Sequence, residues 1–325
     1  MRPTMLLLVV VLLLVSCAPP ATPALRQTST PGPQASTPTF TPKPPTPTFT
    51  PGPPTSTPTP TPGIGSTWTS PMDKMEMVYV PAGSFLMGSS DADPLATSEE
   101  KPQHSVTLDA FWIDRTEVTQ RMYRLCVDAH ACGEPTIIDS ATRFPYWGDP
   151  EGRYEIYPVI HVNWNMAQTY CEWAGRRLPT EAEWEKAARG TDGRLYPWGN
   201  DPPNHDLANY DSYFGDTLNV GRYPKGASPY GAVDMAGNVD EWVSDWYSAT
   251  YYEDSPAANP TGPDSGEKKV LRGGNWYQSK YNGSADLLRA AQRGRFLPAM
   301  PAFPDDQVGL ASAFDNIGFR CARAP

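Results

Sequence analysis

Residues 175–185 read GRRLPTEAEWE, and this stretch decides more about the fold than any other. Thr180 and Glu183 stand at the spacing of a capping box, in which each side chain satisfies the other's free backbone N–H. The pattern therefore predicts an α-helix that starts at this point. Gly190 is expected to end the helix, because glycine readily adopts the left-handed conformation found after helices.

The chain before this stretch predicts two more helices. One is expected over residues 116–130, with Thr119 as a candidate N-cap. The other is expected over residues 164–174, where Asn163 can cap the start and Gly175 can terminate the end. The side chains of the first helix that we expect to face inward are Tyr123, Cys126 and Val127.

Short strands are expected further upstream. Residues 77–88 read MVYVPAGSFLMG, which predicts two strands around a Pro-Ala-Gly turn. Residues 105–113 read SVTLDAFWI and alternate along the run, which predicts one more strand. After residue 190 the chain is rich in Gly, Pro, Asn, Asp and aromatic residues and has few periodic segments. Such long loops need internal support from disulfides, bound ions or buried aromatic rings.

The first 17 residues have the pattern of an exported, lipid-anchored protein. A basic residue, Arg2, precedes an apolar run over residues 5–15 that is too short to span a membrane as a helix. The run ends in LVSC at residues 14–17, which resembles a bacterial lipobox. We therefore expect residues 1–16 to be a lipoprotein signal peptide, with Cys17 diacylated and anchored to a membrane at the bacterial surface. The alternative is an ordinary signal peptide cut elsewhere.

A proline-rich tract follows the expected lipid anchor. Residues 18–63 hold 16 of the 38 prolines, 13 threonines and two charges, Arg26 and Lys43. This composition cannot bury enough apolar surface to offset chain entropy, so we expect a disordered stalk over residues 17–70. Its prolines favour extended polyproline II at ~3.1 Å per residue. The remainder, residues 71–325, is long enough for one large globular domain.

The charge of the globular part argues against one class of partner. The formal net charge of the whole chain is −10. Arg2, Arg26 and Lys43 are the basic residues before residue 64, which leaves 23 of the 26 beside all 36 acidic residues in the globular part. A surface this acidic repels a phosphate backbone, so we expect no nucleic-acid binding. Cation binding suits it better, although a solvated acidic surface gives the same composition.

Export places the cysteines in an oxidising compartment, where disulfides form and persist. With Cys17 lipidated, four cysteines remain, and four cysteines allow three pairings. The short separation of Cys126 and Cys132 favours a local bridge, which would leave Cys171 and Cys321 as a long-range pair.

Eight motifs in order along the chain carry a family resemblance: VPAGSFLMG (80–88), DRTEVT (114–119), PVIHVNW (158–164), GRRLPTEAEWE (175–185), YPWGN (196–200), DMAGNV (234–239), VLRGG (270–274) and NIGFRC (316–321). Through them the domain resembles the formylglycine-generating enzyme, or sulfatase-modifying factor, family. The resemblance implies an α+β domain of C-type-lectin-like fold, with short strands, few helices and long irregular loops. It also supports the Cys171–Cys321 pairing.

The resemblance implies two structural calcium sites, each built from the oxygen donors that calcium prefers. The alternative for both is a set of turn-forming residues that holds no ion. Asp240 stands where the family usually has a tryptophan, which adds a negative charge beside the second site. The first site maps onto the side chains of Asn209 and Asp216 and the carbonyls of Tyr210 and Leu218, and the second onto the side chains of Asp234 and Glu241 and the carbonyls of Gly237 and Val239.

The catalytic part of the resemblance fails at two positions. The family oxidises a substrate cysteine with copper held by two cysteine thiolates, and soft sulfur suits Cu(I). Here Gln278 and Gly283 stand in their place, after Asn275 at the family's serine position. We therefore expect no bound copper and no oxidase activity. A related branch that holds iron through histidines is not indicated either, because the four histidines are scattered.

A third use of this fold is as a binding scaffold, as in the variable proteins of diversity-generating retroelements. Those proteins vary the same C-terminal segment, and here residues 276–282 and 289–295 have the exposed, aromatic and polar composition that suits recognition. We expect a surface-anchored lipoprotein that binds a protein or a glycan; the alternatives are a sulfatase-modifying-type oxidoreductase with a non-standard active site, and ordinary core filling by these residues. The candidate ligand-binding residues are Asn275, Trp276, Tyr277, Gln278, Tyr281 and Arg289.

Overall fold

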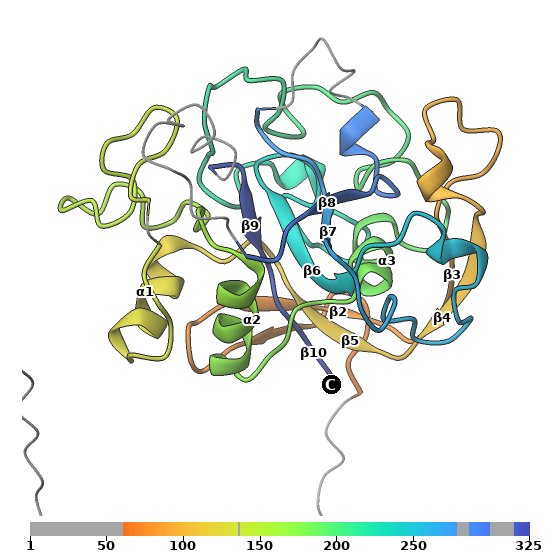
Figure 1. The fold of residues 1–325 in the computed structure, drawn as a ribbon, viewed down its shortest axis with the longest axis horizontal. Coiled ribbons are helices and arrows are strands. Elements are labelled where there is room, and N and C mark those ends of the chain that lie inside the picture. Colours follow the sequence, from red (N-terminus) through yellow and green to blue (C-terminus); the bar gives the residue numbers. More distant parts are fainter. Residues whose placement is uncertain (1–60, 136, 278–285, 300–314) are drawn as a thin grey trace, which may run out of the picture. The chain divides into compact units, whose positions relative to one another are not determined.

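Strand β5, Phe111–Asp114, holds the two ends of the domain together (Figure 1). It pairs antiparallel with β2, Glu76–Val80, and along its other edge with β10, Ala322–Arg323. β1, Thr67–Thr69, completes a sheet of order β1-β2-β5-β10. The computed structural model describes residues 61–135, 137–277, 286–299 and 315–325. The unit from Thr59 to Pro325 is compact.

Two further sheets lie within the described residues. β3, Gly83–Met87, pairs antiparallel with β4, His104–Leu108. The other sheet has the order β8-β7-β6-β9, and its β6 pairs antiparallel with β7 but parallel with β9. The parallel pairing sets Glu241 beside Gly318, so the motifs at 234–239 and 316–321 come together. The strands of this sheet are β6 Asp240–Trp246, β7 Lys269–Arg272, β8 Gly294–Phe296 and β9 Ile317–Phe319.

The α-helices start where their capping residues predict. Thr119 and Asn163 each accept a backbone N–H three residues further on, at 3.3 and 3.0 Å. Thr180 and Glu183 form the predicted capping box, and Gly190 ends that helix at a φ of 69°. The helices are α1 Gln120–Asp128, α2 Trp164–Trp173 and α3 Glu181–Arg189, and the short 3-10 helices are η1 Ser98–Glu100, η2 Pro224–Gly226, η3 Tyr251–Glu253 and η5 Asp286–Leu288.

Two expected boundaries were wrong. The single strand predicted over residues 105–113 is two strands in different sheets, separated at Asp109 and Ala110. The Asp109 N–H bonds the Asn259 side-chain oxygen at 2.9 Å, and Asn259 is too distant in the sequence for a local pattern to show this break. The domain also begins before residue 71, because β1 pairs with β2 inside the stretch assigned to the stalk.

Both expected disulfides are present. Cys126–Cys132 closes a loop directly after α1, with a sequence separation of 6. Cys171–Cys321 joins α2 to the segment before β10, with a separation of 150. All four cysteines are buried, so the long-range bridge fixes the C-terminal strand to the helical side of the core.

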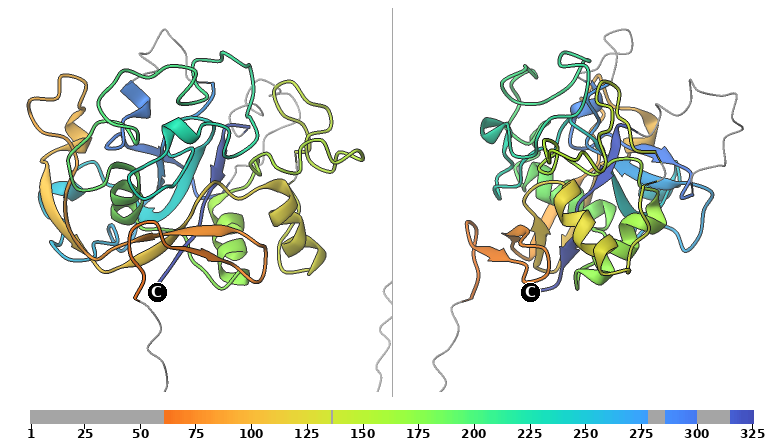
Figure 2. Two further views of the ribbon diagram at one scale, coloured as in Figure 1. Left: turned by 180° about the vertical axis from the view of Figure 1, so that it is seen from behind. Right: turned by 90° about the vertical axis from the view of Figure 1, so that its left-hand side faces the viewer.

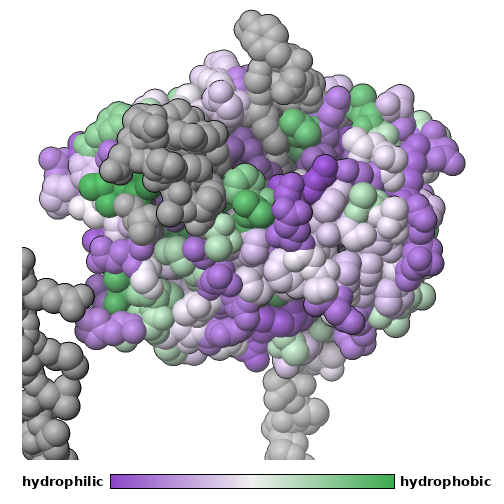
Figure 3. Space-filling model, in the orientation of Figure 1, coloured by the Kyte–Doolittle hydropathy of each residue, from purple (hydrophilic) through white to green (hydrophobic). Residues whose placement is uncertain are grey.

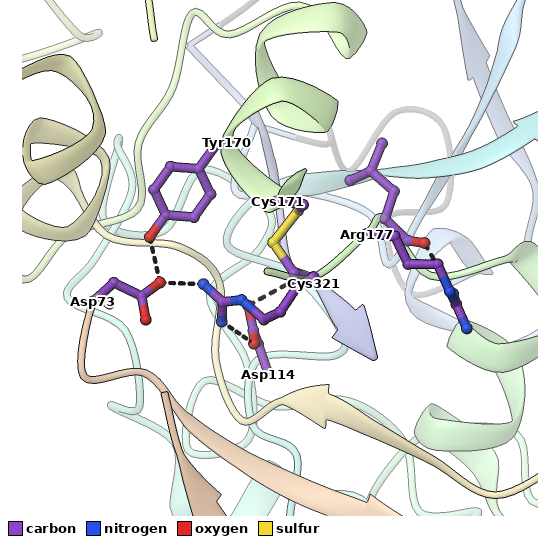
Figure 4. The surroundings of a disulfide bond; sticks show 8 residues. Asp73, Asp114, Tyr170, Cys171, Arg177 and Cys321 are labelled. Carbon is purple, nitrogen blue, oxygen red and sulfur yellow. Dashed lines mark hydrogen bonds and ion pairs between the residues drawn. A yellow bond between two sulfur atoms is a disulfide. The ribbon is translucent and has the colours of Figure 1, made fainter. Parts of the chain in front are cut away.

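A buried ion-pair cluster lies beside the long-range bridge (Figure 4). The Arg176 guanidinium pairs with the carboxylates of Asp73 and Asp114. The Tyr170 hydroxyl donates to Asp73 at 2.6 Å, and the Cys321 N–H donates to Asp114 at 2.8 Å. Because Asp73 precedes β2 and Asp114 ends β5, the cluster ties α2 to the first sheet.

Long loops gather on the side of the domain away from its two ends. In Figures 1 and 2 the first described residues and the C-terminus lie low, while the loops between α3 and β6 lie at the top. The face in Figure 3 is mostly polar, with apolar residues scattered across it. Among the described residues, no helix has the length and apolar character to cross a bilayer.

Candidate functional site

The segment after β7 carries the positions that the resemblance assigns to copper. Asn275 is buried, and its side-chain amide donates to the Asp240 carboxylate at 2.5 Å. Asp240 lies at the start of β6, and burial raises the pKa of its carboxyl to about 7. A hydrogen-bonded acid and amide therefore occupy the positions where the family has tryptophan and serine. Gln278 and Gly283 lie outside the described residues.

The candidate ligand-binding residues divide between the core and the surface. Trp276 is buried, and its indole N–H donates to the Asp315 carbonyl at 3.2 Å. Tyr277 is 61% exposed. Arg289 is buried, and its guanidinium binds both oxygens of Glu100 at 2.6 and 2.7 Å. Ala290, Ala291 and Arg293 are buried too, so the expectation of exposure is wrong for most of the segment 289–295, as it is for Trp276. Gln278 and Tyr281 lie outside the described residues.

All four cysteines of the domain form disulfides. Each of Cys126, Cys132, Cys171 and Cys321 is bonded to another of the four. The fifth cysteine of the sequence is Cys17, in the N-terminal stretch that the structure does not describe. A copper site of two thiolates therefore has no cysteines to draw on in the folded domain.

The second predicted calcium set lies in a buried cluster of charges. Asp234 and Glu241 are joined there by Glu117 and Arg320, and all four side chains are buried. The Arg320 guanidinium binds both oxygens of Glu241, each at 2.7 Å, and the Trp184 indole N–H donates to the same carboxylate at 2.8 Å. Three carboxylates against one guanidinium leave two formal negative charges without a partner.

Glu117 and Asp234 are the two acids of this cluster without an ion-pair partner. Glu117 accepts the Asn238 amide at 2.9 Å, and its carboxyl lies within hydrogen-bonding reach of that of Asp234. Burial, followed by the charge of Asp234, raises the pKa of Glu117 well above its usual value. Burial also raises the pKa of Asp234 to about 6. A proton held between the two carboxyls, or a bound cation, would relieve their repulsion.

Calcium fits this second set only beside Arg320 and with backbone donors, because Glu241 is already bound by Arg320 and Trp184. A divalent cation would neutralise the two charges, and calcium accepts backbone carbonyls beside carboxylates. The carbonyls of Gly237 and Val239 lie in the same tight turn, where Gly237 has a φ of 81°. Across the part of the chain that the structure describes, no group of three His, Cys, Asp or Glu side chains could hold a metal. The turn would therefore have to supply the remaining donors.

The first predicted calcium set does not fit a metal. The Asp216 carboxylate lies 3.0 Å from the guanidinium of Arg143. The Asn209 amide donates to the Asp216 carbonyl at 3.0 Å, and the Leu218 carbonyl accepts the Asn238 amide at 3.3 Å. Tyr210 is buried in a small apolar cluster. The Asp216 carboxylate, which is the one charged donor of this set, is thus paired with an arginine, and the Leu218 carbonyl is already hydrogen-bonded.

A cavity of about 540 Å³ opens beside α2, the start of α3 and the β4–β5 turn. Its floor is apolar and includes Leu108, Trp164 and Leu178. This volume lies within the ~300–1,000 Å³ range of small-ligand pockets. Three hydrogen-bonded polar pairs stand around it, namely Asp109 with Asn259 at 3.1 Å, Gln168 with Glu172 at 2.7 Å, and Arg177 with Glu183 at 2.6 Å.

The fold and these sites define a C-type-lectin-like α+β domain of the sulfatase-modifying type, as the sequence predicts. The chain belongs to the family of the sulfatase-modifying factor enzyme 1-like domain, whose model matches residues 66–325.

Three proteins that are similar to this chain illustrate the range of activities described for such domains. The chain is 33% identical to the formylglycine-generating enzyme of Streptomyces coelicolor over 297 residues, which cover 78% of this chain and 90% of the relative. It is 35% identical over 290 residues to a mouse protein described as inactive C-alpha-formylglycine-generating enzyme 2, covering 76% and 85%. Among solved structures, Treponema denticola variable protein 1 aligns with a TM-score of 0.61 at 26% identity, covering 80% of this chain and 99% of that one.

Sequence reasoning missed three residues that matter in these sites. Glu117 and Arg320 stand inside the quoted motifs DRTEVT and NIGFRC, so their place in a shared motif was a signal that could have found them. Arg143 lies in a stretch without a motif. Its partner Asp216 is 73 residues away in the sequence, and no local pattern joins them.

Proposed function

We propose that this protein is a surface-anchored lipoprotein whose domain binds a protein or glycan ligand and does not oxidise cysteine. The observation that carries the proposal is the state of its cysteines. All four in the domain are bridged, and the two positions that the resemblance assigns to copper ligands hold Gln278 and Gly283. An amide and a glycine cannot replace two thiolates as ligands for Cu(I).

Two relatives support a role other than oxidation. The mouse relative is described as inactive, so the family includes a member without the activity of its name. The Treponema relative is named a variable protein. Both align with about four-fifths of this chain, which is essentially the whole domain.

Two surfaces of the described residues suit ligand recognition. Tyr277 presents an exposed ring, and aromatic rings of this kind supply rigid contact area in binding proteins. The cavity floored by Trp164 combines an apolar floor with polar pairs, which is the usual make-up of a ligand pocket. We assign the principal contact to the Tyr277 surface, because Tyr277 belongs to the aromatic and polar segment that the resemblance marks as the binding region.

We place the domain outside the cytoplasm, held to a membrane through a diacylated Cys17. The two disulfides support an oxidising compartment. The sequence LVSC at residues 14–17, after a short apolar run, supports lipidation.

Structural calcium is proposed at the second set alone. Asp234 and Glu117 are neighbouring acids without an ion-pair partner, and a cation bound by them and by the carbonyls of Gly237 and Val239 would stabilise the loop that leads into β6. Chelation with EGTA should then lower the melting temperature. Metal analysis after dialysis that finds no calcium, with no shift on chelation, would refute this part of the proposal.

The absence of oxidase activity is tested with a Cys-x-Pro-x-Arg peptide and copper under air, with the Streptomyces relative as a positive control. We expect the relative to convert the cysteine to an aldehyde and this protein to leave the thiol intact. An aldehyde formed by this protein would establish the alternative, an oxidoreductase with a non-standard site. Because this chain is 33% identical to a formylglycine-generating enzyme, oxidase activity is the alternative to test first.

The binding half of the proposal is tested on glycan arrays and on arrays of surface proteins. Each array is probed with the wild-type domain and with Tyr277→Ala, which removes a ring that is 61% exposed and contacts buried Trp276 along one edge. We expect a captured ligand whose signal falls on substitution. Equal signals from both proteins would remove Tyr277 from the site.

A further inference from the structure

We propose that Arg143 is the built-in cation of the first predicted calcium set, which therefore holds a guanidinium in place of a metal. The Asp216 side chain is fully buried, and that of Arg143 is only 14% exposed. Arg143 Nη1 lies 3.0 Å from Asp216 Oδ2, and Nη2 donates to the Thr217 carbonyl at 2.9 Å. The guanidinium thus occupies the Asp216 carboxylate, the one charged donor of the predicted set, and a carbonyl beside it.

The surroundings of Arg143 match a guanidinium better than a metal ion. Three tyrosine rings stand near it, with centroids 4.7 Å from Cζ for Tyr157, 5.3 Å for Tyr154 and 5.9 Å for Tyr146. Aromatic rings attract arginine electrostatically and by stacking. Calcium instead needs about six to eight oxygen ligands, which these rings do not provide.

Asp216 has little capacity left for a metal. Its Oδ2 accepts the Ser140 hydroxyl at 2.6 Å, and the N–H and hydroxyl of Thr142 at 2.9 and 2.8 Å. Its Oδ1 accepts the Thr217 N–H at 2.7 Å. A calcium ion at a bonding distance of about 2.3–2.6 Å would have to displace these donors and would be repelled by Arg143. The arginine and the metal therefore exclude each other.

The two predicted sets consequently differ in charge. Arg143 and Asp216 pair one to one, whereas three carboxyl groups, those of Glu117, Asp234 and Glu241, share the single guanidinium of Arg320. Of the two predicted sets, only the second has acids left for a calcium ion. The inference does not depend on ligand binding or on the proposed loss of oxidase activity.

Arg143 also joins the two loops that a bound ion would otherwise join at the first set. Together with Ser140 and Thr142 it ties the segment before α2 to Asp216 and Thr217, about 70 residues further on. These contacts are supplied by the chain itself. This loop should therefore keep its place when calcium is scarce.

The first test compares melting temperatures of the mature protein, with Arg115→Gln as the control. Arg115 pairs with Glu76 at 2.6 Å, and both side chains are exposed, at 48% and 41%. We expect Arg143→Gln to melt roughly 6–20 °C lower than wild type, because it leaves a buried carboxylate unpaired. Arg115→Gln should change the melting temperature by no more than about 2 °C, because its partner stays solvated. An Arg143→Gln protein that melts as the control does would overturn the inference.

The second test titrates the wild type and Asp216→Asn with calcium chloride by calorimetry, and it does not require the arginine variant to fold. We expect the same number of calcium sites in both proteins. A wild-type site that disappears in Asp216→Asn would overturn the inference. A wild type that binds no calcium supports it, while refuting the separate proposal for the second set.

Discussion

Removing the long-range disulfide should destabilise the domain more than removing the local one. All four cysteines are buried, so replacing either pair with alanine removes similar sulfur contacts from the core. The bridges differ in the chain they close, with a separation of 150 for Cys171–Cys321 and 6 for Cys126–Cys132. A longer closed loop removes more freedom from the unfolded chain, so its bridge stabilises the folded state more.

The chain-entropy relation gives the expected magnitudes. It assigns ~5 kcal/mol to the long-range bridge and ~2 kcal/mol to the local one. In a domain of this size each kcal/mol lowers the melting temperature by roughly 2–4 °C. The Cys171→Ala/Cys321→Ala variant should therefore melt roughly 10–20 °C below wild type, and the Cys126→Ala/Cys132→Ala variant roughly 4–8 °C below.

The assay is urea unfolding of the wild type and both double variants, followed by two probes to establish a single transition. The free energies of unfolding come from linear extrapolation to zero urea. Equal losses, or a larger loss for the Cys126–Cys132 pair, would contradict the reasoning. Such a result would mean that local packing around the sulfurs outweighs loop closure.

Three further predictions concern the pH dependence of stability, the space for a side chain at Gly237, and the lipid anchor. Burial, and then the charge of Glu181, raise the pKa of Asp245 to about 7. The folded chain therefore keeps a proton that the unfolded chain releases, so stability is lost as the pH rises from about 4 to about 7. The free energy of unfolding of wild type, relative to Asp245→Asn, should fall by about 3 kcal/mol between about pH 4.5 and 7.5; urea titrations giving a constant difference would count against this. Gly237→Ala should lower the melting temperature far more than Gly231→Ala. A Cβ at Gly237 would lie 2.4 Å from the Asn209 carbonyl oxygen, whereas a Cβ at Gly231 would lie 3.8 Å from a Val78 methyl carbon. Similar melting temperatures for the two variants would contradict this. Cys17→Ala should abolish incorporation of labelled fatty acid and release the protein from the membrane fraction, and persistent labelling would rule out lipidation at this residue.

The sequence predicts those parts of the fold that depend on neighbouring residues. Helix starts follow from Thr119, Asn163 and the Thr180–Glu183 box, because capping acts over three residues. The disulfides follow from cysteine count and spacing. The break at Asp109 does not, because it is fixed by a hydrogen bond to Asn259 across 150 residues.

The sites were predictable only in part, for the same reason. The resemblance assigns Asp234 and Glu241 to one calcium set. The structure adds Glu117, which binds Asn238 across 121 residues of sequence, and Arg320, which binds Glu241 across 79 residues. The composition around Arg289 suggests exposure, yet Glu100 buries its guanidinium from 189 residues away. Whether an arginine is buried or exposed depends on acidic partners that are distant in the sequence. Local sequence patterns do not identify those partners.

The central claim, that this domain has lost the oxidase's copper site, is tested most directly by anaerobic titration with Cu(I) against a competing chelator. The wild type is compared with the double variant Gln278→Cys/Gly283→Cys, which restores two thiols at the assigned positions. We predict that the wild type leaves all Cu(I) with the chelator, while the double variant takes up one equivalent. Tight binding of one Cu(I) by the wild type, together with turnover of the cysteine peptide, would contradict the account.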